Sequence, residues 1–488
     1  MLKKLKSFLF ENTGTKQTVA KNTAWLSISN FGGRLIKAAI VIYGARVLGA
    51  AGWGVFSYAV TLAGFFTLFV DPGINAMLIR EGSKASEEER FTLFSTTFVI
   101  KICALAASVL VVIFIAPFFS TLPGAKILLP LVALIIVFDG LREFFASLLR
   151  AMERMEWDAG AFLLTNLGIV IAGFLFLHFA TTPDSLAWAY VAGTAIGAIT
   201  AAIVIRKYFK KIVSSFSRSL VMPIILAAWP FAVMGILGAL LTNTDIIIIS
   251  WMRTAADVGI YSAAIRLVQL FYLVPGVLQF STLPAFARFA NDNVKFRAAL
   301  ERTVTLIFFV SIPLSLGGII LGTQVMGLIF GSAYIAGGLA LSILMASMFF
   351  DFAGGIVSSA VFALNYQKKL IAASAIGGLS NLIFDLLLIP HFGIAGSAIA
   401  TLIAQILSNS YLWYTMDKIR TFSVMRYLKK ISAAGIGMAL VTLLLLFAHV
   451  NVVINVLVSV GIYFLLLKVL NEPLLSEMKS ILLPPVAV

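Results

Sequence analysis

The sequence is poor in charged residues and nearly devoid of cysteine. Only 12% of its 488 residues are charged, 61% are apolar, and the mean hydropathy is +1.03. A soluble fold would have too little polar surface to cover its core. The single cysteine, Cys103, cannot form a disulfide within the chain. These shortages exclude a soluble globular protein and indicate a polytopic membrane protein.

Several functional motifs are also missing. No glycine-rich run ends in Lys-Ser or Lys-Thr, so direct coupling to ATP is unsupported. The three histidines lack Cys or His neighbours at ligand spacing, so we expect no metal centre beyond a sodium ion and no organic cofactor. Lys3, Lys4 and Lys6 precede only a short apolar stretch, which argues against a cleaved signal peptide.

The apolar residues form about fourteen segments, each long enough to cross a bilayer. Backbone groups must be hydrogen-bonded internally in hydrocarbon, so the segments are expected to be helices in an all-α fold. We place them at 22–46, 53–79, 91–116, 126–149, 159–180, 185–205, 219–251, 258–287, 299–322, 334–364, 369–390, 393–416, 427–448 and 451–469.

Lysine and arginine gather in alternate connecting segments. The opposite segments hold only Arg46, Lys126 and Arg253, although the chain has 36 basic residues. Cytoplasmic loops of membrane proteins retain Lys and Arg, so the pattern predicts an even number of crossings with both termini in the cytoplasm. The net charge of +15 then reflects a membrane-facing basic collar rather than nucleic-acid binding.

A short motif occurs twice in the chain. Ala50-Ala51-x-x-Gly54-x-Phe56-Ser57-x-Ala59 recurs as Ala255-Ala256-x-x-Gly259-x-Tyr261-Ser262-x-Ala264. Six predicted crossings separate the copies, so two lobes of like orientation should be related by a pseudo-twofold axis along the membrane normal. We expect an N-terminal lobe at 1–212, a C-terminal lobe at 213–425, and an extra helix pair with a cytoplasmic tail at 426–488.

Ordered motifs along nearly the whole chain resemble those of a known transporter family. They are Asn30-Phe31-Gly32-Gly33-Arg34, Arg46-Val47-Leu48-Gly49, Asp71-Pro72-Gly73-Ile74, Val258-Gly259-Ile260-Tyr261-Ser262 and Phe392-Gly393-Ile394-Ala395-Gly396. They resemble the polysaccharide flippases of the multidrug/oligosaccharidyl-lipid/polysaccharide exporter superfamily. The resemblance implies two helical bundles around a central cavity and alternating access.

The same resemblance implies the substrate and the setting. A flippase of this family moves undecaprenyl-diphosphate-linked oligosaccharide from the inner to the outer leaflet of the cytoplasmic membrane of a prokaryote. It is a secondary transporter rather than an enzyme. We expect a monomer that contacts membrane lipids, with other membrane proteins of polysaccharide assembly as further partners.

Five basic residues lie within the predicted spans, where a diphosphate at membrane depth would need cations. They are Arg34, Lys37, Lys101, Arg142 and Arg266. Arg34 and Lys37 share one helix face, with no acid within a turn. Arg266 likewise lacks a partner on its own helix, whereas Arg142 lies within a turn of Asp139 and Glu143, which suits an ion-pair cluster equally well.

Alternatives remain for these cations. By resemblance, Arg34 and Arg266 match positions where related lipid-precursor flippases place cavity arginines. They could instead pair with acids on other helices, such as Asp71 or Asp351. Of the five, we take Arg34, Lys37, Arg142 and Arg266 as candidates for diphosphate binding.

A second polar set has the chemistry of a coupling-ion site. Asp245, Asn381, Asp385 and Thr401 are predicted at similar depth, and their oxygens suit a small hard cation. The spacing resembles the sodium site of the lipid-precursor flippases, in which the carbonyl at Ser397 would also coordinate. A proton on a carboxylate, or structural ion pairs with Arg253 or Arg266, would explain the same acids.

Two other functions remain open. A drug or cation exporter of the same superfamily should have an apolar, acidic cavity, which Arg34, Lys37 and Arg266 disfavour. A membrane oligosaccharide polymerase or ligase would need a substantial outer loop, and the predicted outer loops are short. The identity of the glycan is not encoded in any short motif.

Overall fold

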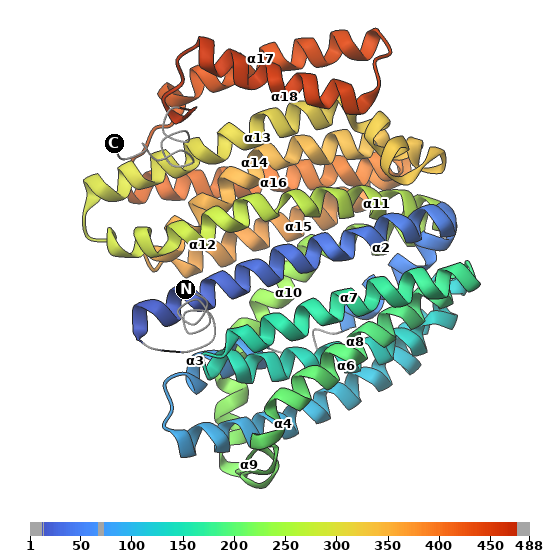
Figure 1. The fold of residues 1–488 in the computed structure, drawn as a ribbon, viewed down its shortest axis with the longest axis vertical. Coiled ribbons are helices and arrows are strands. Elements are labelled where there is room, and N and C mark those ends of the chain that lie inside the picture. The colour runs from blue at the N-terminus through green and yellow to red at the C-terminus, as the bar shows by residue number, and fades with distance from the viewer. Residues whose placement is uncertain (1–11, 13, 67–72, 476–488) are drawn as a thin grey trace, which may run out of the picture. The chain divides into compact units, whose positions relative to one another are not determined.

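The computed structural model describes residue 12 and residues 14–66 and 73–475. Within these ranges the chain forms helices joined by short turns, and no strand occurs there. It divides into two compact units, Met1–Gly259 and Ile260–Val488 (Figure 1). The all-α class is therefore confirmed. The lobe boundaries expected at 212 and 425 remain predictions from the repeat and the charge pattern.

Among the described residues, the first unit contains seven α-helices of six or more residues between Thr15 and Ser214, followed by α10. Their bounds are α2 (Thr15–Phe66), α3 (Ile74–Gly82), α4 (Glu87–Leu110), α6 (Pro123–Ala151), α7 (Met155–Phe179), α8 (Pro183–Ile205), α9 (Phe209–Ser214) and α10 (Val221–Met252), with the short α5 (Ala116–Phe119) before α6. Helix α7 packs against α8 and α2, and α6 packs against α8.

Helix α2 is interrupted where the sequence predicts a boundary between its first two segments. Gly49 has φ 66° and ψ 175°, so two helices meet there at a kink. A side chain at this left-handed φ would be strained, and glycine removes that cost. The break falls between the predicted segments 22–46 and 53–79, which confirms this part of the segmentation.

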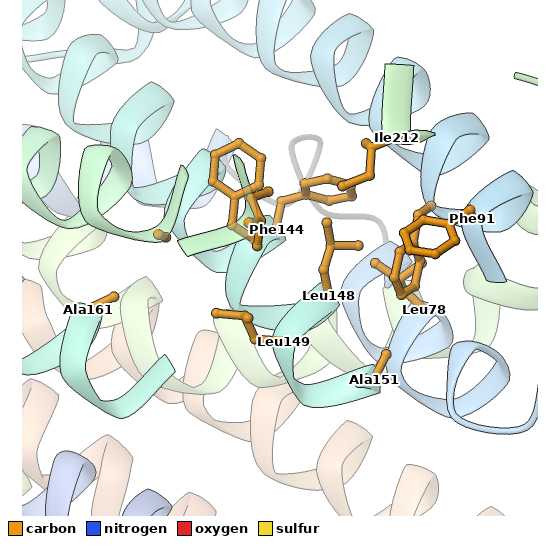
Figure 2. Close-up of a cluster of buried hydrophobic side chains, with 12 residues drawn as sticks. Leu78, Phe91, Phe144, Leu148, Leu149, Ala151, Ala161 and Ile212 are labelled. Carbon is orange, nitrogen blue, oxygen red and sulfur yellow. The ribbon is translucent and has the colours of Figure 1, made fainter. Parts of the chain in front are cut away.

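An aromatic and aliphatic cluster holds one end of the first unit together. Figure 2 shows Leu78 of α3, Phe91 of α4, Phe144 and Leu148 of α6, and Ile212 of α9 converging on one another. All five side chains are buried. Burying a side chain of this size contributes about 1.5–3 kcal/mol, so the cluster fixes α6 against α3, α4 and α9.

The second unit begins within α11 (Ala255–Phe271) and continues to the C-terminal helix pair. Its remaining helices are α12 (Leu273–Arg288), α13 (Asn293–Phe330), α14 (Gly338–Ala363), α15 (Gln367–Phe392), α16 (Ile394–Ile419), α17 (Met425–Phe447) and α18 (Val452–Val469). Helix α14 packs against α13 and α16, and α15 packs against α16.

The last two helices are joined to each other and to α13 by buried polar contacts. The Thr442 and Ser459 hydroxyls lie 2.8 Å apart, and Asn455 Nδ2 donates to the Thr442 carbonyl at 3.1 Å. Tyr463 donates from its hydroxyl to the carbonyl of Phe309 at 2.8 Å. Buried polar groups require such partners, so these bonds specify how α17, α18 and α13 pack.

Twelve helical stretches among the described residues are long and apolar enough to cross a membrane. The chain is a multi-pass membrane protein, but the expected count of about fourteen spans is not confirmed. One stretch, Lys21–Phe66, covers the first predicted segment and the start of the second. Helix α16, which coincides with predicted segment 393–416, is not among the twelve.

Candidate functional site

Two of the predicted diphosphate ligands lie on α2 in the first unit. Arg34 is exposed, and no hydrogen bond or ion pair joins its side chain to another described residue. Lys37 is half-buried, with its Nζ 4.9 Å from the centre of the Tyr190 ring. Asp71, one of the acids considered as a partner for Arg34, lies outside the described residues. Helix α2 therefore presents an exposed guanidinium one turn from an ammonium group that contacts an aromatic face.

Arg142 on α6 is held by neighbouring acids. Its Nη2 lies 3.0 Å from Asp139 Oδ1 and 2.7 Å from Glu143 Oε1, and its guanidinium lies 5.2 Å from the Phe162 ring centre. The Arg142 side chain is 3% exposed. This ion-pair cluster is the alternative to ligand binding that the sequence predicts for Arg142. The two carboxylates neutralise the charge of its guanidinium.

Further ion pairs in the first unit were not recognised from the sequence. Arg150 Nε lies 2.6 Å from Asp158 Oδ2, and Lys21 Nζ lies 2.8 Å from Glu156 Oε2, both carboxylates being buried. The partners of the second pair are far apart in sequence, so no local spacing could reveal it. The Arg150–Asp158 pair joins the last turn of α6 to the first turn of α7. Because only a short turn separates these helices, an acid soon after it was a sequence signal for a partner of Arg150.

Arg266 occupies the α11 segment of the second unit and is only partly exposed. Its Nη1 donates a 3.0 Å hydrogen bond to Gln269 Oε1, three residues along the same helix. The expectation that Arg266 lacks a partner on its own helix was therefore wrong. Because glutamine is neutral, this bond orients the guanidinium without cancelling its charge.

Four of the five predicted coupling-ion residues come together in the second unit. Asn381 Nδ2 donates to Asp385 Oδ2 at 3.2 Å, and Ser397 Oγ donates to Asp385 Oδ1 at 2.9 Å. Thr401 Oγ1 donates to the Ser397 carbonyl at 3.1 Å. Asn381, Asp385 and Ser397 are each 0% exposed. Helices α15 and α16 thus bring together a buried cluster of carboxylate, amide, hydroxyl and carbonyl oxygens.

The fifth residue, Asp245, belongs to α10 in the first compact unit and is 3% exposed. The cluster in the second unit instead gains a neighbour that the sequence did not suggest. The Tyr261 hydroxyl lies 3.5 Å from Thr401 Oγ1. Tyr261 is part of the repeated motif, which was read only as a sign of internal symmetry.

A second polar cluster in this unit, partly buried, was not predicted from the sequence. Asp351 of α14 lies close to the side chains of Tyr272 and Asn409. Tyr272 immediately precedes α12, and Asn409 lies on α16. The three residues come from separate parts of the chain, so their meeting depends on packing that spacing cannot reveal. Asp351 was considered only as a possible partner for the cavity arginines.

Comparison with protein families decides the identity of the chain. Residues 19–290, more than half of its length, match the model of the polysaccharide biosynthesis protein family. The chain belongs to this family. The resemblance seen in its sequence motifs is thereby confirmed.

Curated relatives of this family member come from archaea and bacteria. It is 22% identical over 398 residues to a probable low-salt glycan biosynthesis flippase of Haloferax volcanii, covering 78% of this chain and 80% of the relative. It is 23% identical over 415 residues to a putative O-antigen transporter of Shigella flexneri, covering 80% of this chain and 96% of the relative.

Solved structures share the fold of this family member. The lipid II flippase MurJ in an inward closed conformation has a TM-score of 0.75 at 20% identity, covering 92% of this chain and 99% of that one. A multidrug resistance MATE family transporter of the MOP superfamily in an inward-facing conformation has a TM-score of 0.64 at 14% identity, covering 82% and 98%. The fold is therefore that of these transporters.

Proposed function

We propose that the protein is a flippase that moves undecaprenyl-diphosphate-linked oligosaccharide from the inner to the outer leaflet of the cytoplasmic membrane. Membership of the polysaccharide biosynthesis protein family supports a role in handling glycans. The flippase and transporter names of its relatives, and its many membrane-crossing helices, support transport rather than catalysis.

The observation that carries the proposal is the exposed guanidinium of Arg34. It lies within an apolar membrane-crossing stretch, and no described acid pairs with it. An arginine in a span is costly unless it faces water or an anion, and its planar fork matches phosphate oxygens. We infer that Arg34 binds the diphosphate, with Lys37 beside it on the same helix, and we propose Arg266 separately as a diphosphate ligand.

The same charges weigh against export of a cationic drug. Arg34 and Lys37 lie one helical turn apart on α2, so a cation brought to this face would meet two like charges. Arg266 is also positively charged, and its hydrogen bond to Gln269 does not neutralise it. A drug exporter with this fold would need a predominantly acidic or apolar binding surface.

We propose that the polar cluster around Asp385 on α15 and α16 couples transport to an ion. A sodium ion or a proton bound among Asp385, Asn381, Ser397 and Thr401 would favour one conformation of the second unit if its affinity differs between conformations. Asp245 remains a candidate fifth ligand. The carboxylate, hydroxyl and carbonyl oxygens of the cluster suit sodium, and its buried carboxylate also suits a proton.

Reconstitution of the full chain in liposomes tests the proposed substrate class. Three probes are compared: a polyprenyl-diphosphate-linked oligosaccharide, the same lipid with a monophosphate, and a cationic dye. Movement of sugar is read by its accessibility to a membrane-impermeant glycosidase, and dye movement by fluorescence. We expect fast flipping of the diphosphate-linked sugar, slower flipping of the monophosphate, and no dye transport.

Empty liposomes and liposomes with heat-inactivated protein serve as controls for leakage. Dye transport without movement of lipid-linked sugar would replace the proposal with a drug exporter. A sugar chain lengthened or transferred during the assay would point to a polymerase or ligase instead.

A further inference from the structure

A large basic cavity opens at one end of the second unit, apart from the candidate sites described above. Its volume is about 1210 Å³. It lies among the first turns of α13, the last turn of α16 with the following loop, the first turns of α17, and the segment after α18. The residues that line it include Arg297, Glu301, Arg420, Arg426, Lys429 and Lys430.

Positive charge dominates this basic cavity. Seven of its lining residues are Lys or Arg, and three are Asp or Glu. One of the acids, Glu301, forms ion pairs with two of the arginines. Arg297 Nε lies 2.8 Å from Glu301 Oε1, and Arg426 Nη2 lies 3.0 Å from Glu301 Oε2. Burial raises the pKa of a second acid, Glu472, which favours its neutral form. The cavity therefore keeps a net positive charge that an anionic ligand would offset.

Arg420 is fixed in the wall of the cavity with part of its hydrogen-bonding capacity unused. Its guanidinium lies 4.7 Å from the Phe296 ring centre, and its Nη2 donates to the carbonyl of Ala290. Its Nη1 is buried and has no hydrogen-bond partner among the described residues. A buried donor without an acceptor is costly, and an anionic oxygen in the cavity would satisfy it.

A separate apolar groove lies further along α13 and α17, two of the helices that line the basic cavity. It has a volume of about 370 Å³ and is lined by residues of α13, α14 and α17, including Leu316, Phe349 and Ile436. Ile436 lies six residues beyond Lys430 on α17, which corresponds to about 9 Å along the helix. A basic cavity followed at this distance by an apolar groove matches a ligand with a charged head and a hydrocarbon chain.

We propose that the basic cavity binds the phosphate group of an anionic membrane phospholipid, with one acyl chain in the adjoining groove. The charge pattern predicts that this end of the unit faces the cytoplasm, where anionic lipids supply such headgroups. A free phosphate or diphosphate ion offers the same oxygens without the chain. The site is independent of the flipping reaction proposed above.

The binding test uses the purified, delipidated full chain and native mass spectrometry. The probes are dioleoylphosphatidylglycerol, dioleoylphosphatidylcholine and inorganic pyrophosphate. The pocket variant is Lys429→Gln/Lys430→Gln on α17. Its matched control is Lys368→Gln/Lys369→Gln, an exposed lysine pair that opens α15 in the same unit and lines neither cavity nor groove.

We expect phosphatidylglycerol to bind more tightly than phosphatidylcholine, and its affinity to fall about fivefold for each pocket lysine removed while the control pair has little effect. Pyrophosphate should compete with phosphatidylglycerol. Equal binding of the two lipids, or equal losses in the two variants, would overturn the proposal. Binding of pyrophosphate without phosphatidylglycerol would overturn the lipid assignment and leave a site for a free anion.

Arg420→Lys supplies a second variant that keeps the charge but removes the planar fork. Phosphatidylglycerol binding should weaken in this variant although its unfolding temperature without lipid stays near that of wild type. Unchanged lipid affinity in a folded Arg420→Lys protein would contradict a role for the buried Nη1 in binding.

Discussion

Gly54 and Gly259 meet in a reciprocal backbone contact. A Cβ atom built on Gly54 would lie 1.8 Å from the carbonyl oxygen of Ala255, and one on Gly259 would lie 1.8 Å from the carbonyl oxygen of Ala50. Ala50 and Ala255 are equivalent positions of the repeated motif, as are the two glycines. The two copies of the motif therefore touch each other through equivalent backbone atoms.

Replacing either glycine with alanine should weaken this contact. A side chain in place of either hydrogen would force the two backbones apart, at a cost of about 1–3 kcal/mol. We expect Gly54→Ala and Gly259→Ala to lower the unfolding temperature in detergent. Gly64→Ala on the same helix as Gly54 is the control, because a Cβ there would meet nothing within 4 Å. Equal effects of Gly54→Ala and Gly64→Ala would show that the close approach is not present.

Arg142 should act mainly through its ion pairs. Arg142→Ala leaves the carboxylates of Asp139 and Glu143 without their partner, which should cost about 3 kcal/mol, the low end for buried pairs because both acids are partly exposed. The variant Asp139→Asn/Arg142→Met/Glu143→Gln removes all three charges and should regain most of the stability.

Thermal unfolding and flipping measured on both Arg142 variants separate the two roles. A structural role predicts that stability and flipping return together in the triple variant. A triple variant with wild-type stability but no flipping would instead make Arg142 a substrate ligand.

Asp385 should set the ion dependence of transport. Its carboxylate is the shared acceptor of the Asn381 and Ser397 hydrogen bonds, so Asp385→Asn changes charge with little change in shape. We expect the dependence of flipping on sodium concentration or on pH to disappear, while apparent substrate affinity changes less. Asp184→Asn makes the same replacement at an exposed residue in the first turn of α8. Identical ion profiles for wild type and Asp385→Asn would leave the acid structural.

Local features of the fold and site were predictable from the sequence. Asp139, Arg142 and Glu143 lie within one turn of a helix, and Asn381 and Asp385 are four residues apart, so their contacts follow from helical spacing. The Gly49 break followed from the gap between two apolar segments. Such contacts depend on the geometry of one helix and need no knowledge of packing.

Features assembled from several helices were not predictable in the same way. Asp351 meets Tyr272 and Asn409 only because α14 packs near the start of α12 and against α16. The basic cavity is likewise built from four separate parts of the chain, so no single segment of the sequence reveals it. Gln269 is neutral, so the pattern of charges in the sequence gives no sign that it bonds to Arg266.

If the protein flips a diphosphate-linked oligosaccharide as proposed, Arg34 and Arg266 should each be needed for transport. The most direct measurement is the initial rate of flipping in liposomes by wild type, Arg34→Ala, Arg266→Ala, and the corresponding lysine variants. Arg206→Ala, which changes an exposed arginine at the end of α8, is the control for charge removal. We expect strong loss of flipping in both alanine variants, partial recovery with lysine, which lacks the bidentate fork, and a normal rate in the control. Wild-type flipping by correctly inserted Arg34→Ala/Arg266→Ala protein would contradict the claim.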